Sequence, residues 1–430
     1  MNRISLLRHR VRRLLPETSF LRKLLMLAGG TVAGQAILVL SSPLLTRLFT
    51  PAEFGAFAVF AAVVAIAGMG TGLRFELAIP IVRDEADAAG LVGMTVLCTL
   101  VTTGLALLFM WQTDVRALIN TPDVGLWLWL WLLPLAMLLW GLGSALSFWS
   151  VRRGRFAVSG KALTMQFGSQ AGSQLAFGFA GAGTPGLIVG FLLGYAARSA
   201  YHAVRVPRDE WQLFAAQGPT KIWHSAITNW RYPLMALPSQ LLESICQMAP
   251  VIIMAWLFGP ATAGWYALSQ RIMGLPVRVL SEAASQVFLG ELRHIESHDL
   301  LRFFLRTLLF FTIIGLFGLI PIVILAPPLF ALVFGETWRA AGTMVQLLAP
   351  LYLLRFVMMP ISQVLYYLKR QAFVLLSSIL TALAMIGSFS VSYIFALEAN
   401  EAILLFSLTS SVSLVIYLGV TWIVAKNGSG

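Results

Sequence analysis

The chain has 430 residues, of which 58% are hydrophobic and only 11% are charged. Soluble proteins carry about 25% charged residues, so this composition excludes a soluble globular protein and indicates a polytopic membrane protein. With about 20 apolar residues for each crossing, the chain has room for roughly a dozen spans and no large soluble domain. The net charge of +12 does not point to nucleic acid, because the basic residues lie in short loops between apolar runs.

Signatures of enzymes and metal sites are missing from the sequence. No HExxH, GxSxG or P-loop pattern occurs, although these patterns mark many hydrolases, metalloproteases and nucleotide-binding enzymes. Cys98 and Cys246 both fall in apolar runs and are expected to be free, buried thiols. The sequence therefore predicts no enzyme, no metal site and no cofactor, and coupling to a proton or sodium gradient stays open.

Residues 1–23 are basic, and the apolar run behind them is too long for the core of a signal peptide. We therefore expect a cytoplasmic segment and an uncleaved first span in an all-α protein of twelve membrane helices. The longest internal loop, 205–234, divides these into two six-helix lobes, 24–204 and 235–424, before a cytoplasmic tail, 425–430. The predicted helices cover about 24–46, 53–79, 88–111, 125–150, 157–181, 184–204, 235–257, 264–290, 303–326, 342–368, 372–396 and 401–424.

The distribution of Lys and Arg predicts the orientation of these helices. With the N-terminus inside, 23 of the 30 basic residues fall on cytoplasmic segments, three on the opposite side and four within spans. Short cytoplasmic loops are enriched in Lys and Arg, so this bias predicts that both termini are cytoplasmic.

A short pattern recurs in the two predicted lobes. The sequence LFTPA at 48–52, followed by Gly55, resembles LFGPA at 257–261, followed by Gly264. Both copies lie between the first and second span of their lobe. Six helices per repeat would place both lobes in the same orientation, which suggests a transporter whose site lies between two bundles.

Four arginines and one nearby acid fall inside predicted spans. A charge at the bilayer centre costs roughly 2.5–3.5 kcal/mol, so such a residue faces a protein interior or a wet cavity. Arg271, Arg278 and Glu282 share one helix face, and Arg355 lies at similar depth in another span. Because these cations outnumber the nearby acid, we predict that Arg271, Arg278 and Arg355 bind an anion, with phosphate favoured by the guanidinium fork.

The same arginines also allow structural interpretations. Arg278 is four residues from Glu282 and could pair with it for stability alone. Arg74, which lies near the inner end of its predicted span, is a candidate for the same anion site or for an ion pair with Glu76 or Glu243. These alternatives are not separated by the sequence.

Polar residues also follow helical spacing in two other spans. Gln166, Gln170 and Gln174 form one ridge, which predicts either a polar cavity wall for sugar hydroxyls or hydrogen bonds between packed helices. Glu243 and Gln247 are four apart in the seventh span. A buried acid there is a candidate for coupling to protons or Na⁺, or a counter-ion for an arginine.

Several stretches together resemble one family, the oligosaccharide-lipid flippases of bacterial surface polysaccharide synthesis. This is the Wzx-type branch of the multidrug/oligosaccharidyl-lipid/polysaccharide exporter superfamily. The resemblance rests on PLLTRLFTPAEFGAF (43–57), LRFELAIP (73–80), YPLMALPSQLLESICQ (232–247), 257–291 and 334–371.

The resemblance implies a specific activity. The family has twelve helices in two bundles around a cationic cavity. Its members move an undecaprenyl-diphosphate-linked repeat unit of O-antigen, capsule or exopolysaccharide across the bacterial inner membrane by alternating access. Expected partners are the lipid-linked oligosaccharide, the bilayer, and a polymerase and chain-length regulator of the same lipopolysaccharide or polysaccharide pathway. The alternatives are a cation-coupled drug exporter of the same superfamily and a membrane-embedded polysaccharide-assembly enzyme.

Overall fold

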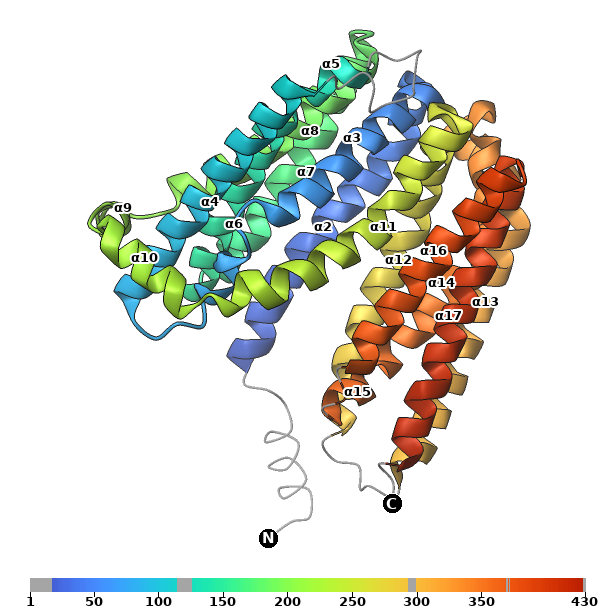
Figure 1. Ribbon diagram of the computed structural model, residues 1–430. Coiled ribbons are helices and arrows are strands. Elements are labelled where there is room, and N and C mark those ends of the chain that lie inside the picture. Colours follow the sequence, from blue (N-terminus) through green and yellow to red (C-terminus); the bar gives the residue numbers. More distant parts are fainter. Residues whose placement is uncertain (1–17, 114–125, 293–298, 369, 371, 428–430) are drawn as a thin grey trace.

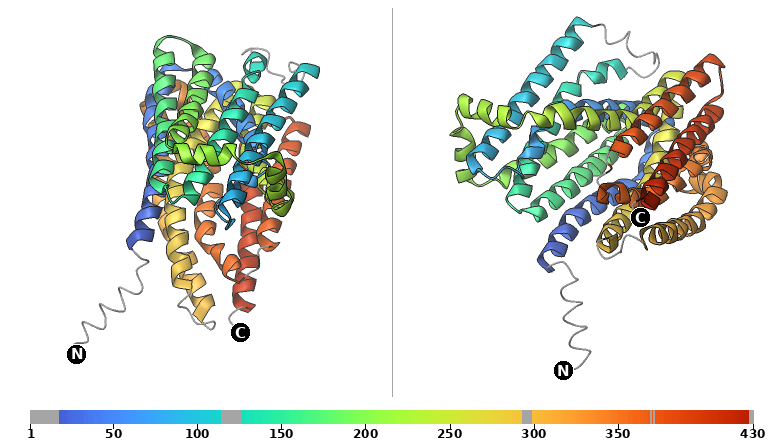
Figure 2. Two further views of the ribbon diagram at one scale, coloured as in Figure 1. Left: turned by 90° about the vertical axis from the view of Figure 1, so that its left-hand side faces the viewer. Right: turned by 60° about the horizontal axis from the view of Figure 1, so that its bottom comes forward.

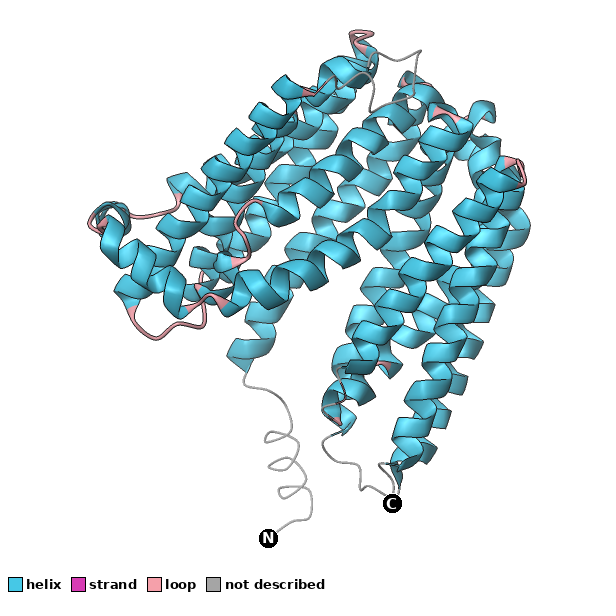
Figure 3. Cartoon of the chain, in the orientation of Figure 1, coloured by secondary structure: helices cyan, strands magenta, loops and turns pink. Residues whose placement is uncertain are grey.

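The computed structural model describes residues 18–113, 126–292, 299–368, 370 and 372–427, except for some side chains within the helices. The described residues form helices joined by short loops (Figure 3). Nine helices in the described part are long and apolar enough to cross a membrane. Three further long helices, α2, α7 and α12, pack beside them. This agrees with the all-α architecture of about twelve membrane helices predicted from the sequence.

The helices form two lobes (Figure 1), and two further views show the long helices running side by side (Figure 2). The N-terminal lobe contains α2 (Thr18–Leu48), α3 (Pro51–Gly70), α4 (Glu85–Gln112), α5 (Leu126–Leu130), α6 (Leu133–Arg152), α7 (Phe156–Phe179) and α8 (Gly183–Val204). Two short helices follow, α9 (Arg208–Ala215) and α10 (Pro219–Thr228), and then a π-helical turn, η2 (Tyr232–Ala236). The C-terminal lobe contains α11 (Leu237–Phe258), α12 (Pro260–Leu292), α13 (Leu300–Phe334), η4 (Glu336–Trp338), α14 (Arg339–Ile361), α15 (Gln363–Tyr367), α16 (Ala372–Ile394) and α17 (Ala399–Asn427).

Local sequence signals explain where helices begin. Thr50 caps α3, since its hydroxyl accepts from the Glu53 N–H while the Glu53 carboxylate accepts from the Thr50 N–H at 2.8 Å. Pro51 then occupies the first turn, where its missing N–H costs nothing. In α12 the equivalent start is Gly259, with a φ of 87°, followed by Pro260. These two starts are the repeated LFTPA and LFGPA patterns.

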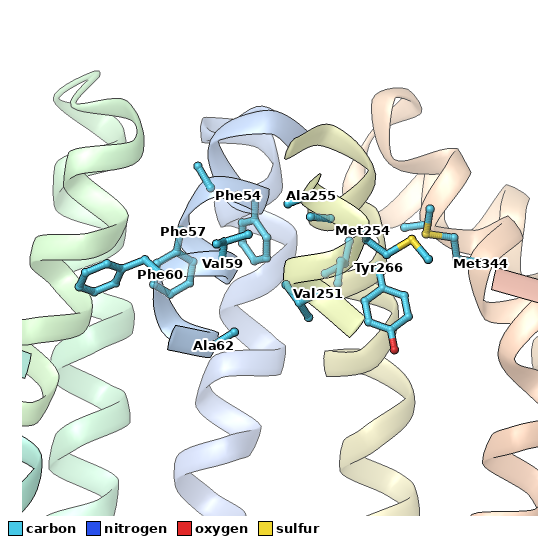
Figure 4. Packing of buried hydrophobic residues seen from close by; sticks show 14 of the residues in the cluster. Phe54, Phe57, Val59, Phe60, Ala62, Val251, Met254, Ala255, Tyr266 and Met344 are labelled. Atoms are coloured by element: carbon cyan, nitrogen blue, oxygen red, sulfur yellow. The ribbon is translucent and has the colours of Figure 1, made fainter. Parts of the chain in front are cut away.

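The lobes meet where α3 and α12 begin. An apolar core joins them, in which Phe54 of α3 lies toward Val251, Met254 and Ala255 of α11 and Tyr266 of α12 (Figure 4). Phe57 and Phe60 point the other way and pack against Phe191 of α8. Trp338 is fully buried at this end, and its indole N–H donates to the Thr46 carbonyl of α2 at 2.9 Å. From this closed end the ribbons of the two lobes diverge toward the end where α2 begins and α17 ends (Figure 1).

The predicted second span, 53–79, is too long. Helix α3 ends at Gly70, and residues 71–82 form turns around a short 3₁₀ helix, η1 (Phe75–Ala78). Leu73 and Arg74 adopt positive φ angles of 47° and 65°, which end a right-handed helix. Arg152 of α6 compensates the lost helical bonds by donating to the Ile79 carbonyl at 2.9 Å. Apolar composition alone does not reveal such a break.

The predicted loop 205–234 is mostly helical and is fastened to the N-terminal lobe. Glu210 of α9 is 5% exposed, and its carboxylate accepts from the indole of Trp149 at 2.8 Å. The same carboxylate pairs with Arg153, at 2.8 Å from Nε, and with Arg155. The segment between the lobes is therefore attached to the N-terminal lobe through the buried carboxylate of Glu210, which accepts from three side chains of that lobe.

Candidate functional site

A cavity of about 290 Å³, here called the central cavity, lies between the two lobes. Helices α2, α3, α7 and α8 supply one side and α11 and α12 supply the other. Its polar lining residues come from both lobes. Gln166, Gln170 and Arg271 are predicted site residues, whereas Tyr195 and Gln270 were not predicted. The arrangement thus brings the glutamine ridge of α7 and the first deep arginine of α12 to one space.

Arg271 reaches from α12 across to the N-terminal lobe. Its Nη1 lies 3.5 Å from the Ser42 hydroxyl of α2, and its guanidinium lies 5.0 Å from the ring centroid of Phe54 in α3. The Ser42 hydroxyl donates to the Leu38 carbonyl at 2.7 Å, so it has lone pairs left for Arg271. No carboxylate among the described side chains forms an ion pair with Arg271. Among the described side chains, this half-buried cation therefore makes one long hydrogen bond and one contact with an aromatic ring.

The glutamines of α7 separate into two environments. Gln166 and Gln170 line the central cavity, and Gln166 accepts from Arg198 of α8 at 3.4 Å. Gln174 is fully buried, and its amide donates to the Leu187 carbonyl of α8 at 2.9 Å. The ridge thus fits both of its predicted interpretations in part: two members face the cavity, whereas the third packs between helices.

A second cavity of about 460 Å³, here called the C-terminal cavity, lies among α11, α12, α14, α16 and α17. Glu243, Gln247 and Arg355 all line it. The Gln247 amide donates to the Glu243 carboxylate at 3.2 Å, and the Arg355 guanidinium lies 5.7 Å from the ring centroid of Tyr352. Within the described part of the chain, Arg355 makes no ion pair. This cavity holds one acid, one cation and several hydroxyl side chains.

The two cavities share part of their walls. Met248 of α11 and Gln270 of α12 line both of them. The Gln270 amide donates to the Tyr266 hydroxyl at 2.8 Å, which leaves its carbonyl oxygen and second N–H for other partners. Arg271 and Arg355 thus lie on neighbouring cavities and not in a single one. Together they offer two cations to any molecule that extends from one cavity into the other.

Arg74 is set apart from both cavities. It is 8% exposed and forms a 3.1 Å ion pair with Glu76, which is 3% exposed. Neither residue lines the central or the C-terminal cavity. Of the alternatives open for Arg74, the geometry favours the ion pair with Glu76, because positive φ angles fold residues 73–74 back within the N-terminal lobe.

Arg278 and Glu282 lie in α12, but their side chains are outside the described residues. Their predicted roles therefore stay predictions. Arg198, which donates to Gln166, lies inside α8 and was not identified as a site residue from the sequence. Its presence inside the predicted span 184–204 is the signal that could have identified it, since intramembrane charges are rare and mark polar cavities. Ser42, which holds Arg271, carries no such signal.

Known structures share this fold. An inward-facing multidrug resistance MATE family transporter of the MOP superfamily aligns with a TM-score of 0.66 at 15% identity, over 92% of this chain and 95% of that one. A MOP superfamily transporter from Pyrococcus furiosus, which has a binding pocket of reversed polarity, aligns with a TM-score of 0.57 at 16% identity, over 95% of this chain and 96% of that one. A MATE structure in the bent conformation gives the same TM-score, identity and coverage.

The sequence itself matches one family. A comparison with curated protein sequences finds no match. Residues 44–343 match the profile of the family described as "Polysaccharide biosynthesis protein". That range contains α3 to α13, every lining residue of the central cavity except Leu38, and the part of the C-terminal cavity wall that comes from α11 and α12, whereas Arg355 lies beyond it. This chain is a multi-pass membrane protein with the MOP-superfamily transporter fold, and it belongs to the polysaccharide biosynthesis protein family.

Proposed function

We propose that this protein is a flippase that moves an undecaprenyl-diphosphate-linked oligosaccharide across the bacterial inner membrane. The observation that carries the proposal is the pair of arginines, Arg271 and Arg355, on adjoining cavities with no ion-paired carboxylate among the described side chains. Both guanidinium groups are half-buried, and a cation that is partly withdrawn from water without an ion-paired carboxylate favours binding of an anion. A diphosphate supplies about two negative charges and several oxygens that match the guanidinium fork.

The neutral groups of the central cavity suit the sugar part of such a substrate. Gln166, Gln170 and Gln270 present amides, which both donate and accept hydrogen bonds as sugar hydroxyls do. They alternate with aromatic and aliphatic side chains of α3 and α8, including Phe57 and Phe191. A cavity with a few polar groups on an apolar lining is typical of a small-molecule site. We infer that the diphosphate binds at the arginines and the sugars extend along the amides.

The arrangement of the lobes supports alternating access. The closed end is held by the core between α3, α11 and α12 and by Trp338, while the lobes diverge at the end where α2 begins. Because Lys and Arg concentrate on that diverging end, we assign it to the cytoplasm, and substrate would enter there. Rocking of the two lobes about the central cavity would then expose the substrate to the opposite side.

Glu243 is our candidate for coupling transport to a proton or sodium gradient. It is an exposed side chain of the C-terminal cavity, held by Gln247 and facing the same space as Arg355. A carboxylate near a guanidinium site competes with an anionic substrate for the cation. Binding of a proton or Na⁺ to Glu243 would remove this competition, and release would restore it.

A drug exporter of the same superfamily remains the second candidate, because the fold neighbours include MATE transporters. Exporters of cationic drugs need an acidic or apolar cavity. The described lining of the central cavity includes Arg271 and no carboxylate. The MOP superfamily transporter from Pyrococcus furiosus has a binding pocket of reversed polarity, which suggests a different function for that protein.

The test is a reconstituted flipping assay. Purified protein is placed in liposomes that contain an undecaprenyl-diphosphate oligosaccharide with a labelled sugar, and a membrane-impermeant enzyme reports how much label reaches the other leaflet. Arg271→Ala should lower the rate at least about tenfold, the loss expected for one charge-assisted hydrogen bond. Arg271→Lys should retain part of the rate, because it keeps the charge and loses the fork.

Arg47→Ala is the matched control, because Arg47 is an exposed arginine at the end of α2. It should transport at the wild-type rate. If liposomes that contain the wild-type protein show no flipping of labelled lipid but accumulate a cationic dye, the flippase proposal is refuted and the drug exporter is favoured.

A further inference from the structure

A third cavity lies on the outer side of the C-terminal lobe, between α12, α13 and α14. Its volume is about 290 Å³, and we call it the apolar pocket. Apart from the Tyr352 hydroxyl, its lining consists of aliphatic, aromatic and glycine residues, including Met273, Ile314, Gly318 and Phe356. Among the side chains that the structure describes, no charged residue lines it. A pocket of this size and composition suits a hydrocarbon chain.

The apolar pocket reaches the face of the protein that contacts lipid. Helix α13 has no charged residue between Arg306 and Glu336 and exposes large apolar side chains along its length. Ile314 and Ile322 each line the pocket and are each 41% exposed. The same residues thus belong to the pocket wall and to the membrane-facing surface, so a chain dissolved in the bilayer can enter sideways.

Two glycines of α13 line the apolar pocket and differ in the space around them. A β-carbon at Gly315 would lie 2.6 Å from Leu353 Cδ1, so Gly315 lets α13 approach α14 closely at this level. A β-carbon at Gly318, one turn further on, would meet nothing within 4 Å. A side chain at Gly315 would therefore displace the end of Leu353, whereas Gly318 leaves space that a larger residue would fill.

The pocket is adjacent to the C-terminal cavity. Val277 and Tyr352 line both spaces, and Arg355 follows Tyr352 on α14 with its guanidinium 5.7 Å from the Tyr352 ring centroid. A charged site and an apolar site therefore share one wall near the middle of α14. An amphiphile with an anionic head next to a hydrocarbon chain matches this arrangement, with the head in the C-terminal cavity and the chain in the apolar pocket.

We propose that the apolar pocket binds the first isoprene units of the polyprenyl chain while the diphosphate lies at Arg355. This inference rests on the proposed function and adds a tail site to it. The chain would leave the C-terminal cavity past Val277 and Tyr352 and continue into the bilayer beside Ile314 and Ile322. Binding energy from the chain would then add to that of the diphosphate, so the same site could accept different sugars.

Two variants fill the pocket in different ways. Gly318→Leu places a side chain into the open space, and Ile322→Trp narrows the pocket from its lipid-exposed edge. Gly387→Leu on α16 is the matched control, because Gly387 is exposed, lines none of the three cavities and has nothing within 4 Å of its built β-carbon. Arg355→Gln removes the head site and leaves the pocket unchanged.

Binding is measured on purified, detergent-solubilised protein with two probes, undecaprenyl diphosphate and inorganic diphosphate. Gly318→Leu and Ile322→Trp should each lower the affinity for undecaprenyl diphosphate about tenfold. This is the loss expected when about two methylene groups lose their buried contacts. Both should bind inorganic diphosphate like the wild type. Arg355→Gln should lower the affinity for both probes, and Gly387→Leu should leave both affinities unchanged.

The outcomes separate this inference from the proposed function. If the wild type does not bind undecaprenyl diphosphate, both fail. If the wild type binds undecaprenyl diphosphate and neither pocket variant lowers that affinity, the tail site is refuted and the proposed flippase function is unaffected. Native mass spectrometry adds a further check: a bilayer phospholipid that stays bound in the presence of saturating undecaprenyl diphosphate, and is lost in Gly318→Leu, would assign the pocket to ordinary lipid and overturn the inference.

Discussion

Gly55 of α3 and Gly264 of α12 pack against each other so closely that neither position has room for a β-carbon. A β-carbon built on Gly55 would lie 1.7 Å from the Pro260 carbonyl oxygen, and one built on Gly264 would lie 2.0 Å from that of Pro51. The contact is reciprocal, because each glycine faces the proline that begins the other helix. The two residues also occupy equivalent places in the repeated pattern, as expected if an axis relates the two lobes here.

This contact predicts how to disturb the closed end. Gly55→Val should prevent α3 and α12 from closing, because the added atoms would overlap backbone that cannot move aside. Transport should be lost, and a cysteine introduced as Thr46→Cys, in a Cys98→Ser and Cys246→Ser background, should react several-fold faster with an impermeant maleimide. Gly70→Val is the control on the same helix, where a β-carbon meets nothing within 4 Å. Unchanged maleimide reactivity in Gly55→Val would contradict this role.

The second prediction concerns the buried pair of Arg74 and Glu76. Breaking a buried ion pair by removing one partner costs about 3–5 kcal/mol, because the remaining charge stays buried alone. Glu76→Gln or Arg74→Met should therefore lower the melting temperature of the purified protein and its level in membranes. The double variant Arg74→Met with Glu76→Met should recover most of the loss, since no buried charge is left.

Transport by that double variant gives the distinguishing result. If the pair only stabilises the turn at 71–82, the double variant should flip substrate near the wild-type rate. A stable double variant without transport would return Arg74 to the candidate substrate site.

The sequence predicted the number and position of the long helices well, since about 20 apolar residues in a row leave little choice. It failed where the chain leaves the helix inside an apolar stretch. Residues 71–82 remain apolar enough to read as membrane helix, and only the backbone angles at Leu73 and Arg74 show the turn. The ion pair with Glu76 then follows from that turn and not from helical spacing.

For the candidate site, the sequence predicts which residues lie together on one helix, but not how residues of different helices come together. Spacing shows which residues share a face, as with Gln166 and Gln170, but not which other helices border that face. Arg271 and Arg355 lie on separate cavities because Met248 and Gln270, on α11 and α12, line the wall between them. Contacts of this kind join residues far apart in the chain and leave no periodic pattern in the sequence.

Topology provides the third prediction. The Lys and Arg bias assigns the diverging end of the lobes to the cytoplasm. A reporter that is active only outside the cytoplasm should be silent when fused after Lys426 or inserted between α9 and α10. The same reporter inserted after Gly335, at the closed end between α13 and α14, should be active. Activity in the reverse pattern would invert the proposed direction of transport.

The last prediction concerns Glu243 as the coupling residue. Its carboxylate is held only by Gln247 within the described part of the chain and shares the C-terminal cavity with Arg355. Glu243→Gln keeps the shape and the hydrogen bond and removes the charge. If a proton or Na⁺ acts by neutralising Glu243, this variant should flip substrate at the same rate with and without an imposed gradient. The wild type should respond to the gradient.

The measurement compares flipping in proteoliposomes with a proton gradient, a sodium gradient or neither. Glu398→Gln, at an exposed position between α16 and α17, controls for a general effect of losing a carboxylate and should keep the wild-type response. Because the amide introduced by Glu243→Gln mimics the neutral carboxyl, the proposal also predicts that Arg355 binds inorganic diphosphate more tightly in the variant, with its competing anion removed. Retained gradient dependence together with unchanged diphosphate affinity would assign Glu243 a structural role, as a partner of Gln247 alone.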